Sequence, residues 1–291
     1  MLQKRANQSA PTPFSWSMRR REMLNRCPRE YFCHYCGSAG GGFLKEGSRE
    51  SEMLHLARNM VSVEAYVSQL LLRELRNAFN AGFTEKDDFV AEAEACFEKE
   101  FRLMLTGKAF CDHKLPLLLE LTQAEFTPEM VREKVLRLLR EEGAALAAKS
   151  LGKLLKTAPE KRLELPFPLK ISWNELDCWC TPVAVYWESG TFCALCAGAE
   201  SEENCALLSF FALEQFRVSP DRVKLFYLDR GDVREGRPVV SFSAPFRRIR
   251  EDVELMKLLE LKSAGRRKEC FPQAIEHCSR CRFYNYCSQE P

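Results

Sequence analysis

The last cysteines of the chain have a spacing that suits a metal centre. Cys278, Cys281 and Cys287 form a C-x2-C-x5-C array in which polar residues flank each cysteine. The two-residue spacer turns two sulfurs in the same direction, and the five-residue loop returns a third thiolate to the same point. Three thiolates need a fourth ligand from elsewhere in the chain. The centre they hold is either a tetrahedral zinc ion or an iron–sulfur cube.

The other cysteines fall into a second group near the start and a larger set with a packing role. The chain has 14 Cys but only 4 His in 291 residues, and a chain of this length does not need disulfides for stability. Cys27, Cys33 and Cys36 lie near the start. Five others alternate with apolar residues and are interpreted as small buried hydrophobes: Cys178, Cys180, Cys193, Cys196 and Cys205. Clustered thiols in such a chain indicate a metal site rather than bridges.

Composition excludes several classes of protein. Apolar residues make up 46% and charged residues 29%, which is ordinary for a soluble globular protein. The 43 Lys and Arg against 41 Asp and Glu give a net charge of +2, which excludes a generally basic nucleic-acid coat and a polyacidic tail. No segment approaches the roughly 18 apolar residues of a membrane span, and no secretory apolar run follows Met1. We therefore expect a cytoplasmic protein that does not bind a membrane.

The nearly balanced charge conceals basic runs next to the cysteines at both ends. Phe283, Tyr284 and Tyr286 lie within the terminal cysteine loop. Basic side chains that meet phosphates, next to aromatic rings that stack on bases, are typical of single-strand binding. The candidate DNA-binding residues are Arg19, Arg20, Arg21, Arg26, Arg29, Arg247, Arg248, Arg266, Arg267 and Lys268.

Composition and periodicity divide the chain into four segments. Residues 1–50 hold a polar lead, a short basic helix over 19–30 that begins at Ser15 or Ser17, and the first cysteines. Residues 51–158 have apolar residues at intervals of three and four, which predicts a helical domain. Residues 159–264 combine strand-like and helical patterns, which predicts an α/β core. Residues 265–291 hold the terminal cysteines.

The core segment should contain a hairpin followed by a helix and further strands. A tight turn at Glu188-Ser189-Gly190 joins two of the expected strands. Helices, hairpin, helix and strand in that order predict an α/β fold with a mixed sheet and an N-terminal helical insertion. We expect strands over residues 163–167, 178–186, 191–197, 223–228 and 238–242, and helices over 205–216 and 252–261.

Both ends of the chain resemble one known family. Phe14-Ser15-Trp16-Ser17 followed by Cys27-Pro28-Arg29-Glu30-Tyr31 is similar to the opening of RecB-like PD-(D/E)XK nucleases, in particular the iron–sulfur members of the CRISPR-associated exonuclease and AddB nuclease-domain type. The resemblance implies a PD-(D/E)XK (restriction-endonuclease-like) core and a 4Fe-4S cluster that ties the two ends together. It implies four ligands, with Cys33 or Cys36 as an alternative to the first: Cys27, Cys278, Cys281 and Cys287.

The same resemblance places catalytic carboxylates on the hairpin, and this chain lacks them. Family members read roughly P-D-x-x-Y and then D-W-K-T-G, with a Gln on the next helix and a His in the helical domain. A hard divalent cation needs such oxygen ligands. The positions that align with these polar residues are apolar or thiol: Leu72, Val183, Ala194, Cys196 and Leu207. The family's active site is therefore expected to be degenerate.

These observations lead to one expected function and two alternatives. The first is a catalytically inactive nuclease-fold subunit that binds DNA, single-stranded or at ends, within a protein complex for DNA processing or defence. An active metal-dependent exonuclease is the second, with Asp177, Glu175 or Glu188 as relocated metal ligands. The third is a protein-interaction scaffold without DNA binding. Zinc remains an alternative to the iron–sulfur cluster.

Overall fold

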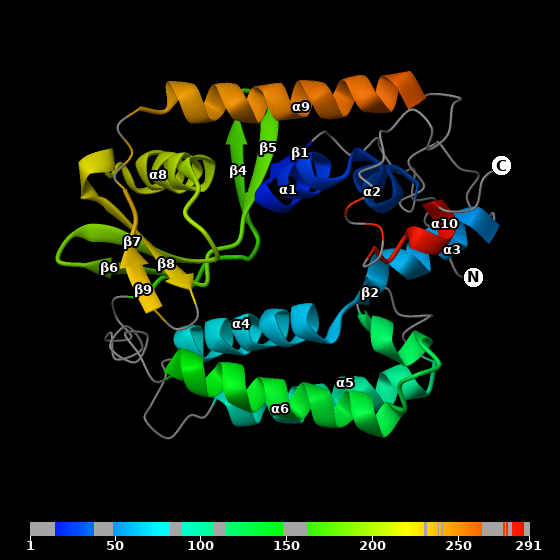
Figure 1. The fold of residues 1–291 in the computed structure, drawn as a ribbon. Coiled ribbons are helices and arrows are strands. Elements are labelled where there is room, and N and C mark those ends of the chain that lie inside the picture. Colours follow the sequence, from blue (N-terminus) through cyan, green and yellow to red (C-terminus); the bar gives the residue numbers. More distant parts are fainter. Residues whose placement is uncertain are drawn as a thin grey trace, which may run out of the picture.

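The protein has a mixed α/β architecture in which helices cover small sheets (Figure 1). Its structure, a computed structural model, describes residues 15–37, 49–81, 89–107, 115–147, 162–229, 232–237, 239, 241–263, 276, 278 and 281–287. The mixed α/β class expected from the sequence is confirmed within these residues. Helices dominate the first half of the described chain, and strands enter mainly after residue 168.

The N-terminal segment forms a strand and three short helical turns. Strand β1 (Ser15–Ser17) leads into α1 (Met18–Arg26), and the hydroxyl of Ser17 accepts a hydrogen bond from the backbone N–H of Arg20 at 3.3 Å. Ser17 is thus the N-cap, as predicted. The predicted single helix over 19–30 is wrong at its end, because Pro28 disfavours a helical conformation at the preceding residue. The chain becomes extended at Cys27 and continues as α2 (Pro28–Tyr31) and the π-helix η1 (Phe32–Gly37).

The predicted helical segment is confirmed in its described parts. Thr127 caps α6, since its hydroxyl accepts from the backbone N–H of Met130 at 3.3 Å. A short parallel pair, β2 (Met60–Val61) with β3 (Leu117–Leu118), adds to the helices. The helices are α3 (Arg49–Asn59), α4 (Val63–Ala81), α5 (Phe89–Leu105) and α6 (Pro128–Ala147).

The first sheet joins the N-terminus to the middle of the chain. Its order is β1-β5-β4, where β4 is Leu169–Trp173 and β5 is Leu176–Cys180. The predicted strand over 163–167 is wrong, because the described chain there makes only an isolated bridge at Arg162. The predicted strand over 178–186 is two strands in different sheets. Thr181, Pro182 and Val183 separate them, and proline lacks the N–H that a continuous ladder requires.

The second sheet has the order β6-β7-β8-β9 and contains the predicted hairpin. Ser189 and Gly190 have φ values of 49° and 75°, which are typical of a two-residue hairpin turn. Helix α8 (Glu202–Phe216) connects β7 to β8, which run parallel. The strands are β6 (Ala184–Glu188), β7 (Thr191–Ala197), β8 (Val223–Asp229) and β9 (Asp232–Glu235).

The end of the α/β core differs from the prediction. The expected strand over 238–242 is wrong in its described residues, and β9 is instead the antiparallel partner of β8. The last long helix, α9 (Ser243–Ser263), begins at Ser243 rather than at residue 252. A short helix, α10 (Tyr284–Cys287), lies near the C-terminus, and Arg282, which precedes it, donates to the carbonyl of Arg58 in α3.

Two hydrophobic cores lie on the two faces of the second sheet. Side chains alternate along a strand, and neighbours in β7 accordingly enter different cores. Ala194 and Cys196 pack in the core that contains α8, whereas Cys193 and Leu195 pack in the core formed by α4, α5 and α6. The helical segment therefore covers one face of the sheet, with α8 on the other side (Figure 1). The five cysteines of the β-rich stretch are all buried, as predicted.

Candidate metal centre

Two of the N-terminal cysteines lie at breaks in helical structure. Cys27 stands between α1 and α2, and its backbone N–H donates to the carbonyl of Met23 at 2.9 Å. Cys33 lies in the π-helix η1 and is fully buried. Tyr31 and Phe32, both buried in the same core, hold this stretch against the rest of the protein. The thiols are therefore on a well-packed segment rather than on a loose loop.

The terminal cysteines lie on a tight turn that continues into α10. The backbone N–H of Cys281 donates to the carbonyl of Cys278 at 3.1 Å, and that of Cys287 donates to the carbonyl of Phe283 at 2.9 Å. Phe283 is fully buried and belongs to the same core as Cys33. The aromatic side chain thus anchors the cysteine turn, and the thiols of Cys278, Cys281 and Cys287 are half-buried. Phe283, predicted as a base-stacking residue, is a core residue instead.

The structure brings thiols from the two ends of the chain together. The thiol of Cys33 is hydrogen-bonded with that of Cys287, and it lies within electrostatic range of Cys281 and Cys27. The bond with Cys287, burial and the neighbouring thiols raise the pKa of Cys33. Burial raises the pKa of Cys281 to about 11, with Glu30, Cys287 and Cys27 adding to the effect. We call Cys27, Cys33, Cys281 and Cys287 the thiol junction.

The thiol junction differs in one member from the ligand set that the family resemblance implies. Cys27, Cys281 and Cys287 are common to both, whereas Cys33 stands in the junction beside Cys287. Cys278 is one turn away along the chain, joined to the junction through the backbone of Cys281. Cys33 was predicted only as a substitute for Cys27, but the fold places both of them at the same point. The chain offers five thiols, including Cys278, where four ligands are needed.

The thiols are gathered but are not arranged as a cage for a single ion. Among the described residues, no group of three or more His, Cys, Asp or Glu side chains is placed to hold one metal ion. A zinc ion binds sulfur at about 2.3 Å, which brings tetrahedral thiolates to about 3.8 Å from one another. An iron–sulfur cube attaches each thiolate to a different iron and so holds the sulfurs farther apart.

Arg282 fixes the cysteine turn to the first half of the chain. Its Nη1 donates to the carbonyls of Arg58 at 2.9 Å and Met60 at 3.0 Å, and its Nη2 lies 3.3 Å from Nδ1 of His34. The side chain is 13% exposed, and burial lowers its pKa. Sequence reasoning missed Arg282, although its place inside the cysteine array between two candidate ligands was visible. Its role depends on contacts with residues more than 200 positions away.

His34 is a neutral ring beside the junction. Burial lowers the pKa of His34 to about 2, and the positive charges of Arg282 and three further arginines add to this effect. Since Arg282 only donates, Nδ1 of His34 accepts, and the proton of the neutral ring lies on Nε2. His34 follows Cys33 directly in the chain. The guanidinium of Arg282, the neutral imidazole of His34 and the carboxylate of Glu30 therefore all lie near the thiol junction.

The positions aligned with catalytic residues are filled with hydrophobic core. Val183, Ala194, Cys196 and Leu207 are each at most 5% exposed, and Leu72 is half-buried. Val183 packs in the core shared with the helical segment, whereas Ala194, Cys196 and Leu207 pack in the core that contains α8. Burial raises the pKa of Cys196 to about 12, which keeps it a neutral thiol. These side chains do not converge on a polar cavity.

The three acids considered as relocated ligands are separated in the structure. Asp177 lies in the first sheet, where its carboxylate accepts from Lys170 at 2.8 Å and from Ser172 at 3.0 Å. Glu175 stands in the turn between β4 and β5, and Glu188 ends β6 in the other sheet. Glu188 is at the opposite end of its strand from Val183, about 16 Å away at 3.3 Å per residue. The fold does not gather these carboxylates around one point.

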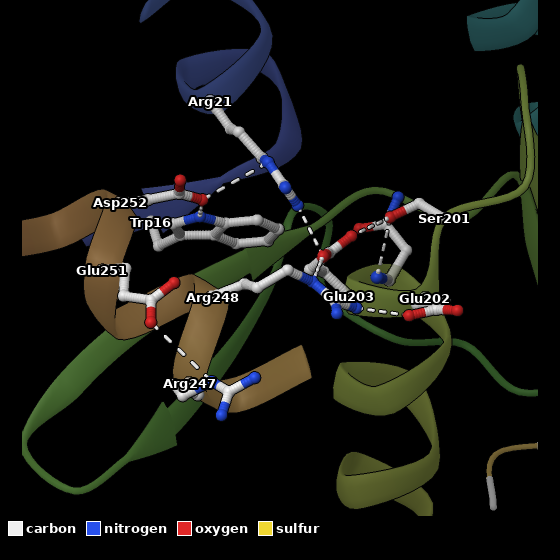
Figure 2. A network of polar contacts seen from close by, with 10 residues as sticks. Trp16, Arg21, Ser201, Glu202, Glu203, Arg247, Arg248, Glu251 and Asp252 are labelled. Carbon is white, nitrogen blue, oxygen red and sulfur yellow. Dashed lines mark hydrogen bonds and ion pairs between the residues drawn. The ribbon is translucent and has the colours of Figure 1, made fainter. Parts of the chain in front are cut away.

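Two of the predicted DNA-binding arginines are held by carboxylates (Figure 2). Arg21 lies 2.6 Å from Glu203 and 3.5 Å from Asp252. Arg248 pairs with Glu203 at 2.5 Å and also with Glu202. Burial alone would raise the pKa of Glu203, but hydrogen bonds from Arg21 and Arg248 lower it to about 2. This network joins α1, α8 and α9.

The network also includes the tryptophan of the opening motif. The indole N–H of Trp16 donates to the carboxylate of Asp252 at 2.9 Å, and the ring is fully buried. Figure 2 shows Trp16 on β1 next to Asp252 on α9, with Arg21 above both. The opening motif therefore contributes a structural contact between β1 and α9.

The other predicted DNA-binding residues have varied surroundings. Arg26 makes two hydrogen bonds to the carboxylate of Glu30, at 3.0 and 2.8 Å. Arg20 donates to the carbonyl of Ser15 and lies over the ring of Tyr35 at 4.4 Å. Arg247 makes an exposed pair with Glu251 on α9, Arg19 is exposed, and Arg29 is half-buried. Arg266, Arg267 and Lys268 lie outside the described residues.

Fold and site define a mixed α/β protein in which a thiol junction ties the N-terminal segment to the C-terminal turn. None of the described helices is long and apolar enough to cross a membrane. No model of a known protein family matches the chain, and no curated protein matches it either.

Proposed function

We propose that the protein is a catalytically inactive PD-(D/E)XK-like subunit that carries a structural 4Fe-4S cluster and binds DNA within a larger assembly. One observation carries this proposal: thiols about 250 residues apart in the chain meet at one point. Closing a loop of that length through a metal centre restricts the unfolded chain and stabilises the folded one. The cluster would be held by four of the five thiols, namely Cys27, Cys33, Cys278, Cys281 and Cys287.

The donor chemistry supports an iron–sulfur cluster over zinc. The candidate ligands are all sulfur, and iron–sulfur clusters are bound mainly by cysteine thiolates. Arginines near the junction, among them Arg282, would offset the negative charge of a cluster with four thiolates. The cluster's contribution is to fix the terminal turn against η1.

The absence of polar residues at the aligned hairpin positions supports a loss of catalysis. Val183, Ala194 and Cys196 provide no oxygen ligand, and all three are buried. The hairpin, the helix α8 and the parallel strand β8 retain the order of elements that the family resemblance implies. The chain would thus retain the scaffold of a nuclease without the acids that bind a cation.

Metal analysis of anaerobically purified protein tests the cluster. We expect iron and acid-labile sulfide in similar amounts and little zinc. Replacement of one junction ligand, Cys287→Ser, should remove most of the iron, whereas Cys96→Ser, a half-buried cysteine of α5, should not. Zinc without sulfide would overturn the iron–sulfur assignment. Equal metal content in wild type and Cys287→Ser would overturn the junction as the site.

A scaffold without DNA binding is the second candidate, and the carboxylate-paired arginines favour it. Arg21, Arg26 and Arg248 are already paired within the protein, and breaking such pairs opposes phosphate binding. Titration with single-stranded and double-stranded oligonucleotides at increasing salt separates the two functions. Affinity that falls steeply with salt supports the DNA-binding subunit. No binding at low salt, together with a stoichiometric protein partner from the native host, supports the scaffold.

A further inference from the structure

A polar pocket lies between the N-terminal segment and the helical segment, next to the thiol junction. Its volume is about 350 Å³. Arg19 of α1, His34 of η1 and Arg58 of α3 line one side, and residues of α4 and α5 line the other. The pocket is too small for a duplex, but a single nucleotide unit is of suitable size. Its lining is dominated by polar side chains and carries several guanidinium groups.

Two of the three arginines that line this pocket, Arg19 and Arg58, are not neutralised by a described carboxylate. Among the described residues, neither Arg19 nor Arg58 has a carboxylate partner. Arg58 is partly buried, which lowers its pKa, and the charges of Arg19 and Arg20 lower it further. Arg282 lies behind His34 and adds a further positive charge, with Glu30 4.0 Å away as its nearest recorded carboxylate. Like charges held this close repel each other, and a bound anion would relieve the repulsion.

The pocket contains one carboxylate, and it is already engaged. Glu100 accepts a hydrogen bond from the hydroxyl of Tyr66 at 2.7 Å and from Arg73 at 2.9 Å. Arg73 also contacts Glu74 at 2.9 Å. The negative charge of Glu100 is therefore balanced by Arg73 of α4. Arg19 and Arg58 remain as the groups available to a ligand.

The neighbouring neutral groups suit a phosphate as well. The imidazole ring of His34 forms part of the pocket lining. Asn59 and Gln69 contribute amide groups to the lining. Guanidinium groups bind phosphate oxygens through paired, charge-assisted hydrogen bonds. Two guanidiniums with flanking amides in a half-enclosed pocket are typical of a site for a phosphate group.

We infer that this pocket binds a phosphomonoester group, carried either by a free nucleotide or by the terminal nucleotide of a strand. The inference does not depend on the cluster or on the proposed DNA-binding function. The site differs from the aligned nuclease hairpin, since it lies between α1, η1, α3 and α4 and includes no residue of β6 or β7. Its ligand is recognised through charge and the ester oxygens rather than through metal coordination.

Calorimetric titration of the full-length protein tests the site. dTMP should bind in a salt-dependent way and thymidine, which lacks the phosphate, should not. Arg58→Gln and Arg19→Gln should each weaken dTMP binding by about tenfold or more, because each removes a hydrogen-bonding partner that carries charge. Arg137→Gln on α6 is the matched control, since Arg137 is exposed and does not line the pocket, and this variant should bind as the wild type does.

A second variant should change the affinity in the opposite direction. Glu100→Gln removes the one carboxylate of the pocket while its amide oxygen still accepts from Tyr66, and dTMP binding should become a few times tighter. Equal binding of dTMP and thymidine, or unchanged affinity in both Arg19→Gln and Arg58→Gln, would overturn the inference. Circular dichroism of each variant verifies that a loss of binding is not a loss of folding.

The source of the phosphate follows from competition. A 5′-phosphorylated oligonucleotide that displaces dTMP, when its 5′-hydroxyl counterpart does not, identifies a strand end as a ligand; failure of both identifies the free nucleotide. Unchanged dTMP affinity in Arg58→Gln and Arg19→Gln, together with salt-sensitive DNA binding, would refute this site and leave the proposed function standing. Binding of dTMP without any DNA affinity would support this site and refute the proposed DNA-binding function.

Discussion

The thiol junction and the β6–β7 hairpin are both rich in cysteine, yet they are built for different purposes. In the junction, Cys33 contacts Cys287 across most of the chain length, and cationic side chains such as Arg282 stand close by. In the hairpin, Cys193 and Cys196 point into separate hydrophobic cores on opposite faces of the sheet.

This contrast teaches that residue type alone does not identify a ligand. A thiol among apolar side chains stays protonated, as the pKa of about 12 for Cys196 shows, and it serves as a small hydrophobe. The neighbouring thiol of Cys287 raises the pKa of Cys33, and burial raises that of Cys281, so these thiols are protonated as well. They differ from Cys196 in that thiols from both ends of the chain lie side by side. The hairpin is therefore core, and the junction is the place where a metal centre is expected.

The largest expected effect comes from placing a carboxylate in the hairpin. Ala194→Asp introduces an acid at a fully buried position where the family resemblance expects one. Burial raises the pKa of such an acid by about 3 units or more, which corresponds to about 4 kcal/mol of stability at neutral pH. Denaturant unfolding measures the loss, and Ala144→Asp on the exposed face of α6 is the control.

Added divalent cation sharpens this first test. If the hairpin is core, Mg²⁺ or Mn²⁺ should not restore the stability of Ala194→Asp. Restored stability with either ion would show that the hairpin has a cation site beside β7 and is not only hydrophobic core.

The second prediction concerns Phe283, the hydrophobic anchor of the thiol junction. Phe283→Ala should cost about 3–5 kcal/mol, as expected for a buried Phe, and it should release metal because the cysteine turn loses its contact with the core. Phe283→Leu retains most of the volume and should retain most of the metal. Denaturant unfolding measures the loss of stability, and metal analysis of the same variants measures the metal that they retain. Full metal retention in Phe283→Ala would show that the turn does not need this anchor.

The smallest effect concerns the arginine network beside the first sheet. Glu203→Gln removes the charge that Arg21 and Arg248 share and should cost about 1.5–3 kcal/mol at neutral pH. The pKa of Glu203 is about 2 in the folded protein, below its ordinary value of 4.5. Its contribution is therefore complete above about pH 4.5 and is lost as the pH falls towards 2.

Acid titration of stability checks the sign of that effect. Wild type should lose more stability than Glu203→Gln between about pH 4.5 and 2, since the variant has no charge to lose there. Glu251→Gln, which removes an exposed pair with Arg247 on α9, should follow the wild-type curve. An identical acid dependence of wild type and Glu203→Gln would show that the network does not stabilise the fold.

Local patterns predicted the elements that depend on neighbours in sequence. Ser17 caps α1, and Ser189 and Gly190 turn the hairpin, because each acts on residues within four positions. The predicted bounds of two elements were wrong because a proline interrupts each of them. Pro182 divides the stretch 178–186 between two sheets, and Pro28 ends the first helix earlier than its polarity pattern indicates.

The candidate site was predictable only in part, because its residues come from segments that are far apart in the sequence. The family resemblance predicted Cys27, and spacing predicted the terminal cysteines. It did not distinguish Cys33, which becomes a junction member only because the π-helix η1 packs against the cysteine turn. The basic runs were visible as well, but their carboxylate partners Glu203 and Asp252 come from α8 and α9, and no spacing rule connects them to Arg21.

By itself, the sequence determined the mixed α/β class, the helical segment, the hairpin and the presence of a cysteine array at the C-terminus. These follow from periodicity, capping and turn chemistry, which act over a few residues. Only the tertiary structure decided which thiols meet, which arginines are neutralised, and that Arg19 and Arg58 remain around a pocket. Those outcomes depend on contacts between distant segments, because charge pairing and burial are set by the residues that folding brings together.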